Sequence, residues 1–202
     1  MSESKIDGHD GKISRMTDSE VTQAKTALRA KIRAARKSKQ EGHFCEDEHD
    51  EHLVLFLADQ NVRKIAAYIA LDDEPCTDLL LDVCEQVGIQ VLVPRVVNDD
   101  LEWAIFNWDD LTEGEFGILE PTGPAEPLQV DAVLVPALAV DAAGNRLGKG
   151  RGFYDRALAE LESRVPIIAL VHDEEVYEEI PHETHDLKVD YVACCTGVHK
   201  LD

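Results

Sequence analysis

The sequence predicts a three-layer α/β fold in which a mostly parallel sheet is flanked by helices. Strand-like and helix-like segments alternate along most of the chain, which is typical of βαβ units and a parallel sheet. The run Ala132-Val133-Leu134-Val135 shows no polar alternation, as expected of a strand that is buried on both faces. A length of 202 residues suits one domain, so we expect a flexible tail over residues 1–17 and one domain over residues 18–202.

The first predicted helix begins at Thr17-Asp18-Ser19-Glu20, where Thr17 and Glu20 have the spacing of a capping box, and runs to about Lys39. One face carries Val21, Ala24, Leu28, Ile32 and Ala35 at helical spacing, and beside it lies a stripe of Lys25, Arg29, Arg33 and Arg36. Such a stripe is by itself more often solvated than functional.

The remaining elements follow in order between turn residues. An acidic connection over residues 41–52 leads into a buried helix over residues 53–58. We then expect strands over 64–70, 90–97, 101–106, 131–140, 166–171 and 191–196, and helices over 77–87 and 152–163. Gly88 ends the first of these helices. The strand over 101–106 is the more polar one and suits a sheet edge, while three prolines make residues 120–130 an extended loop.

The net charge of −21, from 20 basic and 41 acidic residues, argues against nucleic-acid and membrane partners, because both need a basic surface. Any anionic ligand must therefore be held by a few well-placed cations. The five cysteines form no Cys-x-x-Cys pair, and no apolar run reaches the roughly 20 residues of a membrane span. With no signal peptide in the N-terminal residues, the sequence predicts a cytoplasmic protein with free thiols.

The segment after the strand 131–140 is the most informative part of the chain, because ligands bind beyond the carboxyl ends of parallel strands. It reads Arg146-Leu147-Gly148-Lys149-Gly150-Arg151-Gly152 and leads into a predicted helix. Alternating glycines let backbone N–H groups approach a ligand, and three cations lie within six residues. The pattern fits neither a P-loop nor a Rossmann fingerprint. It indicates phosphate binding, and a flexible loop with solvated cations is the alternative.

The stretch Arg146-Leu147-Gly148-Lys149-Gly150-Arg151-Gly152-Phe153-Tyr154-Asp155-Arg156 resembles the signature of the 5-formyltetrahydrofolate cyclo-ligase family, which is close to R-L-G-x-G-x-G-Y-Y-D. The resemblance covers about residues 20–197 and implies that family's three-layer, Rossmann-like fold. The other segments that resemble the family are Lys25-x-x-Leu28-Arg29, Tyr68 with Glu74, Pro94-Arg95, Gly117 to Pro121, Val135 to Asp141, and Ile180 to Asp190.

The resemblance implies an enzyme that uses ATP and Mg²⁺ to convert 5-formyltetrahydrofolate into 5,10-methenyltetrahydrofolate, ADP and phosphate, through a phosphorylated N5-formyl intermediate. The implied metal ligands are Asp155 and Asp186. The implied folate contacts are Ile69, Glu74 and Tyr154. The implied ATP-binding residues are Lys25, Arg29, Arg146, Leu147, Gly148, Lys149, Gly150, Arg151, Gly152, Phe153 and Tyr154, with Arg146, Lys149 and Arg151 as catalytic groups.

Several alternatives stay open. Without the resemblance, Asp155 would be a favourable charge in a first helical turn, and Glu74 an ordinary acidic loop residue. A relative that binds nucleotide or folate without turnover is the main functional alternative, and an ATP-dependent kinase or ligase acting on another small acid is a weaker one. We expect a monomer. The chain departs from the family pattern at Ala137, Val140, Arg151, Phe153 and Glu175, which bears on affinity more than on the reaction.

Two histidine clusters could suggest other metal sites. His43, Glu46, His49 and His52 lie in a dense acidic run, for which a solvated loop is the better interpretation. His182 and His185 precede Asp186, but no further suitable ligand lies nearby in the sequence, so magnesium at Asp186 is preferred to zinc. Trp103 and Trp108 could stack on a flat ring, although core packing is the commoner role of tryptophan.

Overall fold

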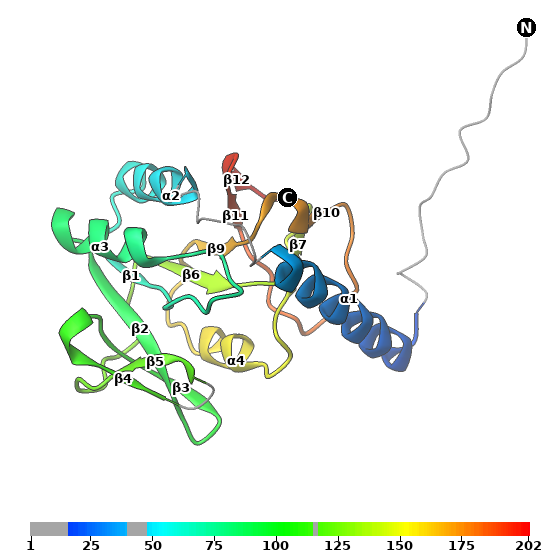
Figure 1. Cartoon of the computed structure of the whole chain (residues 1–202), viewed down its shortest axis with the longest axis horizontal. Helices are drawn as coiled ribbons and strands as arrows, with labels where there is room; N and C mark the ends of the chain where they lie inside the picture. The colour runs from blue at the N-terminus through cyan, green and yellow to red at the C-terminus, as the bar shows by residue number, and fades with distance from the viewer. Residues whose placement is uncertain (1–15, 40–47, 115–116) are drawn as a thin grey trace, which may run out of the picture.

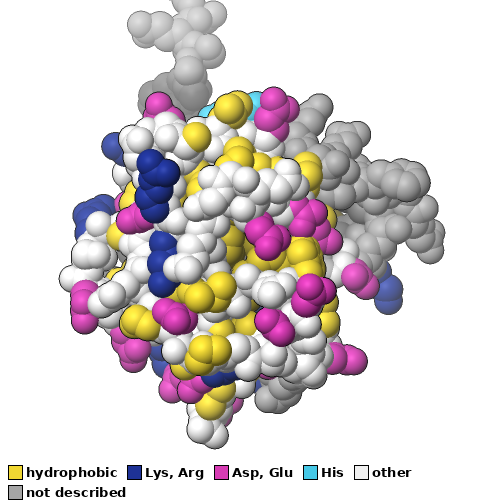
Figure 2. Space-filling view, turned by 90° about the vertical axis from the view of Figure 1, so that its left-hand side faces the viewer, with side chains coloured by type: hydrophobic (Ala, Val, Ile, Leu, Met, Phe, Trp, Pro, Cys, Tyr) yellow, Lys and Arg dark blue, Asp and Glu magenta, His cyan; other side chains and the backbone are white. Residues whose placement is uncertain are grey.

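The computed structural model describes residues 16–39, 48–114 and 117–202 and confirms the α/β class with a mostly parallel sheet. Residues 1–15 of the predicted tail, and His43 and Glu46 of the acidic cluster, lie outside the described residues. Within the described part, no helix is both long and apolar enough to cross a membrane. Acidic side chains are spread over the face seen in Figure 2 and are not gathered into one patch.

The central sheet has seven strands in the order β12-β11-β9-β6-β1-β2-β3. The five inner strands run parallel, and an antiparallel strand closes each edge. The more polar strand β3 lies at one edge, as its composition predicts. The strands are β1 (Lys64–Ala66), β2 (Gln90–Val97), β3 (Asp100–Ile105), β6 (Ala132–Pro136), β9 (Ile167–Leu170), β11 (Tyr191–Cys194) and β12 (Gly197–Lys200).

Helices cover both faces of this sheet and complete three layers (Figure 1). On one face lie α2 (Glu48–Asp59) and α3 (Asp78–Val87), whose buried leucines belong to the larger core cluster. On the other face, α4 (Phe153–Ala159) buries Ala157 and Leu158 in a second cluster. Gly88 ends α3 with a left-handed φ of 77°, a conformation that glycine adopts without strain.

The first helix, α1 (Asp18–Lys39), lies beside the sheet and packs Ile32 against a third, smaller cluster. The predicted capping box forms, since the Thr17 N–H donates to Glu20 Oε2 at 2.8 Å and the Glu20 N–H donates to Thr17 Oγ1 at 3.4 Å. The buried face differs from the predicted one. Lys25 and Arg36 are buried, whereas Ala35 is exposed, so part of the basic stripe faces the protein interior.

The prediction of one strand over residues 131–140 is wrong. The chain leaves the central sheet after β6 and enters a small sheet of β10 (Val176–Tyr177), β7 (Ala139–Asp141) and β8 (Arg146–Leu147). The Leu138 N–H donates to the carbonyl of Leu147, so the apolar run ends in a hairpin that presents the glycine-rich segment. Apolar composition does not reveal this change of partner. A two-stranded sheet of β4 (Leu111–Glu113) and β5 (Leu119–Pro121) also escaped prediction.

Other boundaries differ for local reasons. Helix α2 begins at Glu48, inside the predicted acidic connection, and buries Asp50. Strand β1 ends at Ala66 rather than at residue 70, because the Tyr68 carbonyl and the Ala70 N–H bond to the Thr77 hydroxyl instead of to a neighbouring strand. Helix α4 stops at Ala159 rather than near residue 163, since most of the next side chains are exposed and a longer helix would bury little. Strand β12 was not predicted.

Candidate active site

A cavity of about 740 Å³ opens beyond the carboxyl ends of the parallel strands, a size within the roughly 300–1,000 Å³ range of small-ligand sites. Helix α1, the ends of β1 and β2, the segment 146–156 and the loop 183–186 line it. Every residue assigned above to ATP, folate or metal lies on its wall: Lys25, Arg29, Ile69, Glu74, Arg146, Leu147, Gly148, Lys149, Gly150, Arg151, Gly152, Phe153, Tyr154, Asp155 and Asp186.

The turn before the glycine-rich segment is built around the buried carboxylate of Asp141. Asp141 Oδ1 accepts from the N–H groups of Ala143 and Asn145, and its Oδ2 accepts from the Ile180 N–H. Gly144 completes the turn at a φ of 78°, where a β-carbon would lie 2.6 Å from the Val189 carbonyl oxygen. The chain is therefore forced to reverse here and to return toward the cavity at Arg146.

Helix α1 holds the glycine-rich segment from one side. Arg29 Nε donates to the Gly148 carbonyl at 2.8 Å, and Arg33 Nη2 donates to the Lys149 carbonyl at 3.1 Å. Gly150 and Gly152 have φ values of 106° and 69°, which side-chain-bearing residues rarely adopt. Helix α4 is only 7 residues long, so any attraction for an anion would come from the cations of the segment more than from a helix dipole.

The cations of the site are paired with carboxylates. Arg146 Nη2 lies 2.7 Å from Asp155 Oδ1 and is almost fully buried. Lys149 Nζ lies 2.9 Å from Glu74 Oε1 and 3.3 Å from Asp73 Oδ1, with about a third of its side chain exposed. Each pair joins a residue of the glycine-rich segment to a group that also lines or borders the cavity. A bound anion would compete with these carboxylates for the same positive charges.

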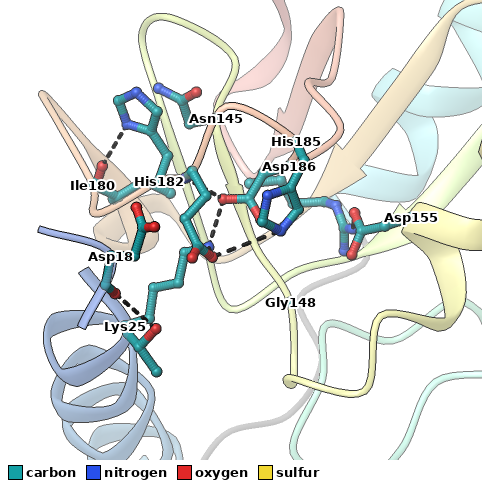
Figure 3. Close-up of polar contacts among 12 residues, drawn as sticks. Asp18, Lys25, Asn145, Gly148, Asp155, Ile180, His182, His185 and Asp186 are labelled. Carbon is teal, nitrogen blue, oxygen red and sulfur yellow. Dashed lines mark hydrogen bonds and ion pairs between the residues drawn. The ribbon is translucent and has the colours of Figure 1, made fainter. Parts of the chain in front are cut away.

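Lys25 reaches from α1 to the loop before β11 and lies 2.6 Å from both Glu183 Oε2 and Asp186 Oδ2 (Figure 3). Asp186 also accepts a hydrogen bond from the Glu183 N–H at 2.7 Å. Burial raises the pKa of Asp186, but the hydrogen bonds from Lys25 and from the Glu183 N–H outweigh it and lower that pKa below 3.8. Asp186 is therefore ionised at neutral pH, as a metal ligand needs to be.

One group of possible metal ligands stands out in the described part of the chain. Oxygen or nitrogen atoms of Glu183, His185 and Asp186 lie within 4.8 Å of one another. Asp186 belongs to the predicted pair, whereas Asp155 is not in this group and contacts Arg146 instead. Both carboxylates line the cavity and offer the oxygen ligands that Mg²⁺ prefers. A shared ion at Asp155 and Asp186 stays a prediction.

Glu74 and Tyr154, two of the residues assigned to folate, also line the cavity. The side chain of Glu74 is 5% exposed, and its Oε2 accepts from the Leu71 N–H at 3.0 Å. Burial, and then the charge of Glu74, raises the pKa of Tyr154, so its phenol stays neutral and can donate a hydrogen bond. Trp103 is a core residue that meets the Tyr154 ring edge-on at 6.3 Å. Trp108 donates to Asp82, and neither tryptophan lines the cavity.

Sequence reasoning assigned no role to several residues of the cavity wall. Glu183 precedes Asp186 by three residues in a segment that resembles the family's closing loop, so its proximity to Lys25 could have been suspected. Arg33 continues the basic stripe of α1. Tyr68 follows the carboxyl end of β1, where ligands bind in parallel sheets. The wall residues without an assigned role include Arg33, Tyr68, Arg95, Glu120, Glu183 and His185.

A buried ion pair between Arg36 and Glu175 lies next to the loop that carries Glu74. Arg36 Nε donates to Glu175 Oε1 at 2.6 Å, and both side chains are less than 5% exposed. The same guanidinium donates to the carbonyls of Asp73 and Ala137. Glu175 and Ala137, two departures from the family pattern, therefore share one partner. Through Asp73, Arg36 also holds the loop that carries Glu74.

The fold and cavity define an α/β protein with a cavity lined by paired cations and carboxylates at the carboxyl end of a parallel sheet. The profile of the 5-formyltetrahydrofolate cyclo-ligase family matches residues 21–195, and the chain belongs to this family. It is 40% identical over 140 residues to a 5-formyltetrahydrofolate cyclo-ligase of Mycolicibacterium smegmatis, covering 64% of this chain and 72% of that one. It is 29% identical over 177 residues to the Haemophilus influenzae protein of the same name, covering 82% and 95%.

A solved structure of similar fold leads to the same family. The Aquifex aeolicus 5,10-methenyltetrahydrofolate synthetase superposes with a TM-score of 0.76 at 26% identity, covering 88% of this chain and 92% of that one. A Mycoplasma pneumoniae 5,10-methenyltetrahydrofolate synthetase superposes with a TM-score of 0.63 at 22% identity. The three-layer arrangement predicted from the sequence is thus the fold of these proteins.

Proposed function

We propose that this chain converts 5-formyltetrahydrofolate into 5,10-methenyltetrahydrofolate with consumption of ATP, acting as a monomeric, single-domain cytosolic enzyme. The observation that carries the proposal is the gathering of the family's glycine-rich segment, Lys25, Glu74 and Asp186 on one cavity wall. Family membership supports the folate reaction. The local cations resolve the conflict between a net charge of −21 and two anionic substrates.

In the proposed reaction, the formyl oxygen of the folate attacks the γ-phosphorus of ATP, and ADP leaves. N10 of the same folate then attacks the formyl carbon and closes the ring. The N10 proton is lost to water, and inorganic phosphate departs with the former formyl oxygen. Phosphorylation converts a poor leaving oxygen into a good one, so the protein needs no nucleophile of its own. Its tasks are alignment of the two substrates and neutralisation of charge on the transferred group.

The segment 146–152 is suited to those tasks. Arg146 and Lys149 carry charges that would move from their present carboxylate partners to phosphate oxygens. Arg151 adds a third charge on the same wall. Arg29, which already holds the Gly148 carbonyl, would keep the loop in place while nucleotide binds, and Lys25 would contribute one turn earlier on the same helix.

Glu74 and Tyr154 form the proposed folate end of the site, with Ile69 as an apolar contact. A carboxylate can accept two hydrogen bonds from the amino-substituted edge of a pterin ring. Mg²⁺ held by Asp155 and Asp186 would neutralise phosphate charge when bound. In that state the two carboxylates would serve the ion, and Arg146 and Lys25 would be freed for ATP.

The proposal is tested by mixing purified protein, Mg²⁺, ATP and 5-formyltetrahydrofolate and following the methenyl chromophore together with ADP. We expect equal amounts of both products. Lys149→Ala should lose most activity, whereas Lys31→Ala should retain it, since Lys31 lies over the Tyr177 ring and outside the cavity. Binding of ATP without either product would reject catalysis and favour a binding relative. ADP formation only with another acceptor would reject the folate substrate.

A further inference from the structure

Two residues that line the cavity each have a buried polar atom without a hydrogen-bond partner in the described structure, Oη of Tyr68 and Nε of Arg146. Buried polar groups nearly always have a partner, because an unsatisfied one is costly. Arg146 already belongs to the proposed phosphate site. Tyr68 has no role in the proposal above, so its hydroxyl is the unexplained group.

The position of Tyr68 is fixed by its surroundings. The residue follows β1 at the carboxyl end of the sheet and is 4% exposed. Its carbonyl accepts a hydrogen bond from the Thr77 hydroxyl at 2.9 Å, and Thr77 Oγ1 in turn accepts from the Ala70 N–H at 3.1 Å. Thr77 is itself fully buried. The backbone that carries the ring is therefore held, and the tyrosine is built into the wall.

The surroundings of the hydroxyl indicate what it binds. Burial raises the pKa of Tyr68 well above its ordinary value, and the charge of Glu74 and the neighbouring Tyr154 add to this shift. The phenol thus keeps its proton and can act as a donor. Glu74 and Tyr154 of the proposed folate site act on it, as do the charges of Arg36 and Asp50, and the Tyr68 ring is part of the larger apolar core. This setting suits a flat heterocycle with a polar edge.

We propose that Tyr68 is a substrate-binding residue whose hydroxyl donates a hydrogen bond to a ring nitrogen or carbonyl oxygen of the heterocycle bound beside Glu74. The inference rests on the proposed function, which supplies a folate as that heterocycle. A buried donor that only the ligand satisfies discriminates strongly, because a ring without the acceptor leaves the donor unpaired. Tyr68 therefore selects the ring end of the substrate, while the glycine-rich segment selects phosphate.

The test is Tyr68→Phe, which removes one oxygen atom that has no partner in the ligand-free protein. We expect the dissociation constant of 5-formyltetrahydrofolate, measured by calorimetry, to rise about tenfold, as for one lost hydrogen bond. The ATP dissociation constant and the thermal unfolding temperature of Tyr68→Phe should equal those of the wild-type protein. In turnover assays KM for folate should rise more than kcat changes. Tyr191→Phe is the matched control, since Tyr191 contacts Phe56 and lies outside the cavity.

Three outcomes would overturn the inference, and a fourth would overturn only the proposed catalysis. Unchanged folate affinity in Tyr68→Phe would show that the hydroxyl does not bind the substrate. A clear loss of thermal stability, with ATP and folate binding weakened equally, would show a structural role. A wild-type protein that binds no folate would reject the proposed function and this inference together. A wild-type protein that binds folate without turnover would reject catalysis alone, because the Tyr68 comparison uses binding.

Discussion

Replacement of Glu175 by alanine should strongly destabilise the protein, because it leaves the Arg36 guanidinium buried without its counter-charge. Arg36 donates to both carboxylate oxygens, at 2.6 and 2.7 Å, and both side chains are less than 5% exposed. Burial lowers the pKa of Arg36, but the hydrogen bond and charge of Glu175 outweigh it and raise that pKa above its ordinary value. A guanidinium does not lose its proton in proteins, so Arg36 stays charged in the variant even without Glu175.

The size of the effect follows from this geometry. Removing one partner of a buried ion pair costs about 3–5 kcal/mol. For a chain of this size, 1 kcal/mol shifts the unfolding midpoint by about 2–4 °C, so Glu175→Ala should lower it by roughly 6–20 °C. Glu175→Gln keeps an acceptor oxygen but loses the charge, and should cost about 1–3 kcal/mol. Residual carbonyl contacts of Arg36 with Asp73 and Ala137 remain in both variants.

Thermal unfolding followed by circular dichroism measures these shifts. Arg164→Ala is the control, since Arg164 pairs with Asp190 at 3.0 Å but is 90% exposed, and exposed pairs contribute about 0–1 kcal/mol. If Glu175→Ala lowered the midpoint no more than Arg164→Ala does, the reasoning from burial would be refuted. A drop for Glu175→Gln as large as for Glu175→Ala would refute the role assigned to the remaining acceptor oxygen.

Three further predictions concern the site and its turn. Lys149→Ala should lower kcat about 10²–10³-fold, as for loss of one group that stabilises developing charge, with the unfolding midpoint within 2–4 °C of wild type; normal kcat would remove Lys149 from catalysis. Because the pKa of Asp186 is lowered below 3.8, its stabilising effect is present above that pH and is lost as the pH falls through the native pKa. The free energy of unfolding, measured with urea, should therefore fall more on acidification in the wild type than in Asp186→Asn. Parallel pH profiles of the two proteins would contradict this. Gly144→Ala should lower the free energy of unfolding by about 1–3 kcal/mol, since φ is 78° and a β-carbon would lie 2.6 Å from a carbonyl oxygen. Gly123→Ala is the control, because a β-carbon there would have no atom within 4 Å. Equal urea midpoints for the two variants would contradict the prediction.

The sequence by itself determined the order and kind of most elements. Helix α1, with its capping box, and the glycine stop of α3 follow local rules that act over three or four residues. The continuous apolar run at β6 reveals a strand buried on both faces for the same reason. The glycine-rich segment is likewise local, so its residues could be named in advance, and the structure places them all along one cavity.

Only the tertiary structure decided which groups meet. Lys25 pairs with residues 158 and 161 positions away, and Arg36 pairs with one 139 positions away. No periodicity in the sequence encodes such contacts, so the basic stripe of α1 could not be divided into buried and solvated members. The split of the run 131–140 between two sheets and the unpartnered hydroxyl of Tyr68 also depend on packing between distant segments. Local patterns predict helices and strands because these elements depend on interactions between residues close in sequence. The pairing of charges depends instead on how those elements pack.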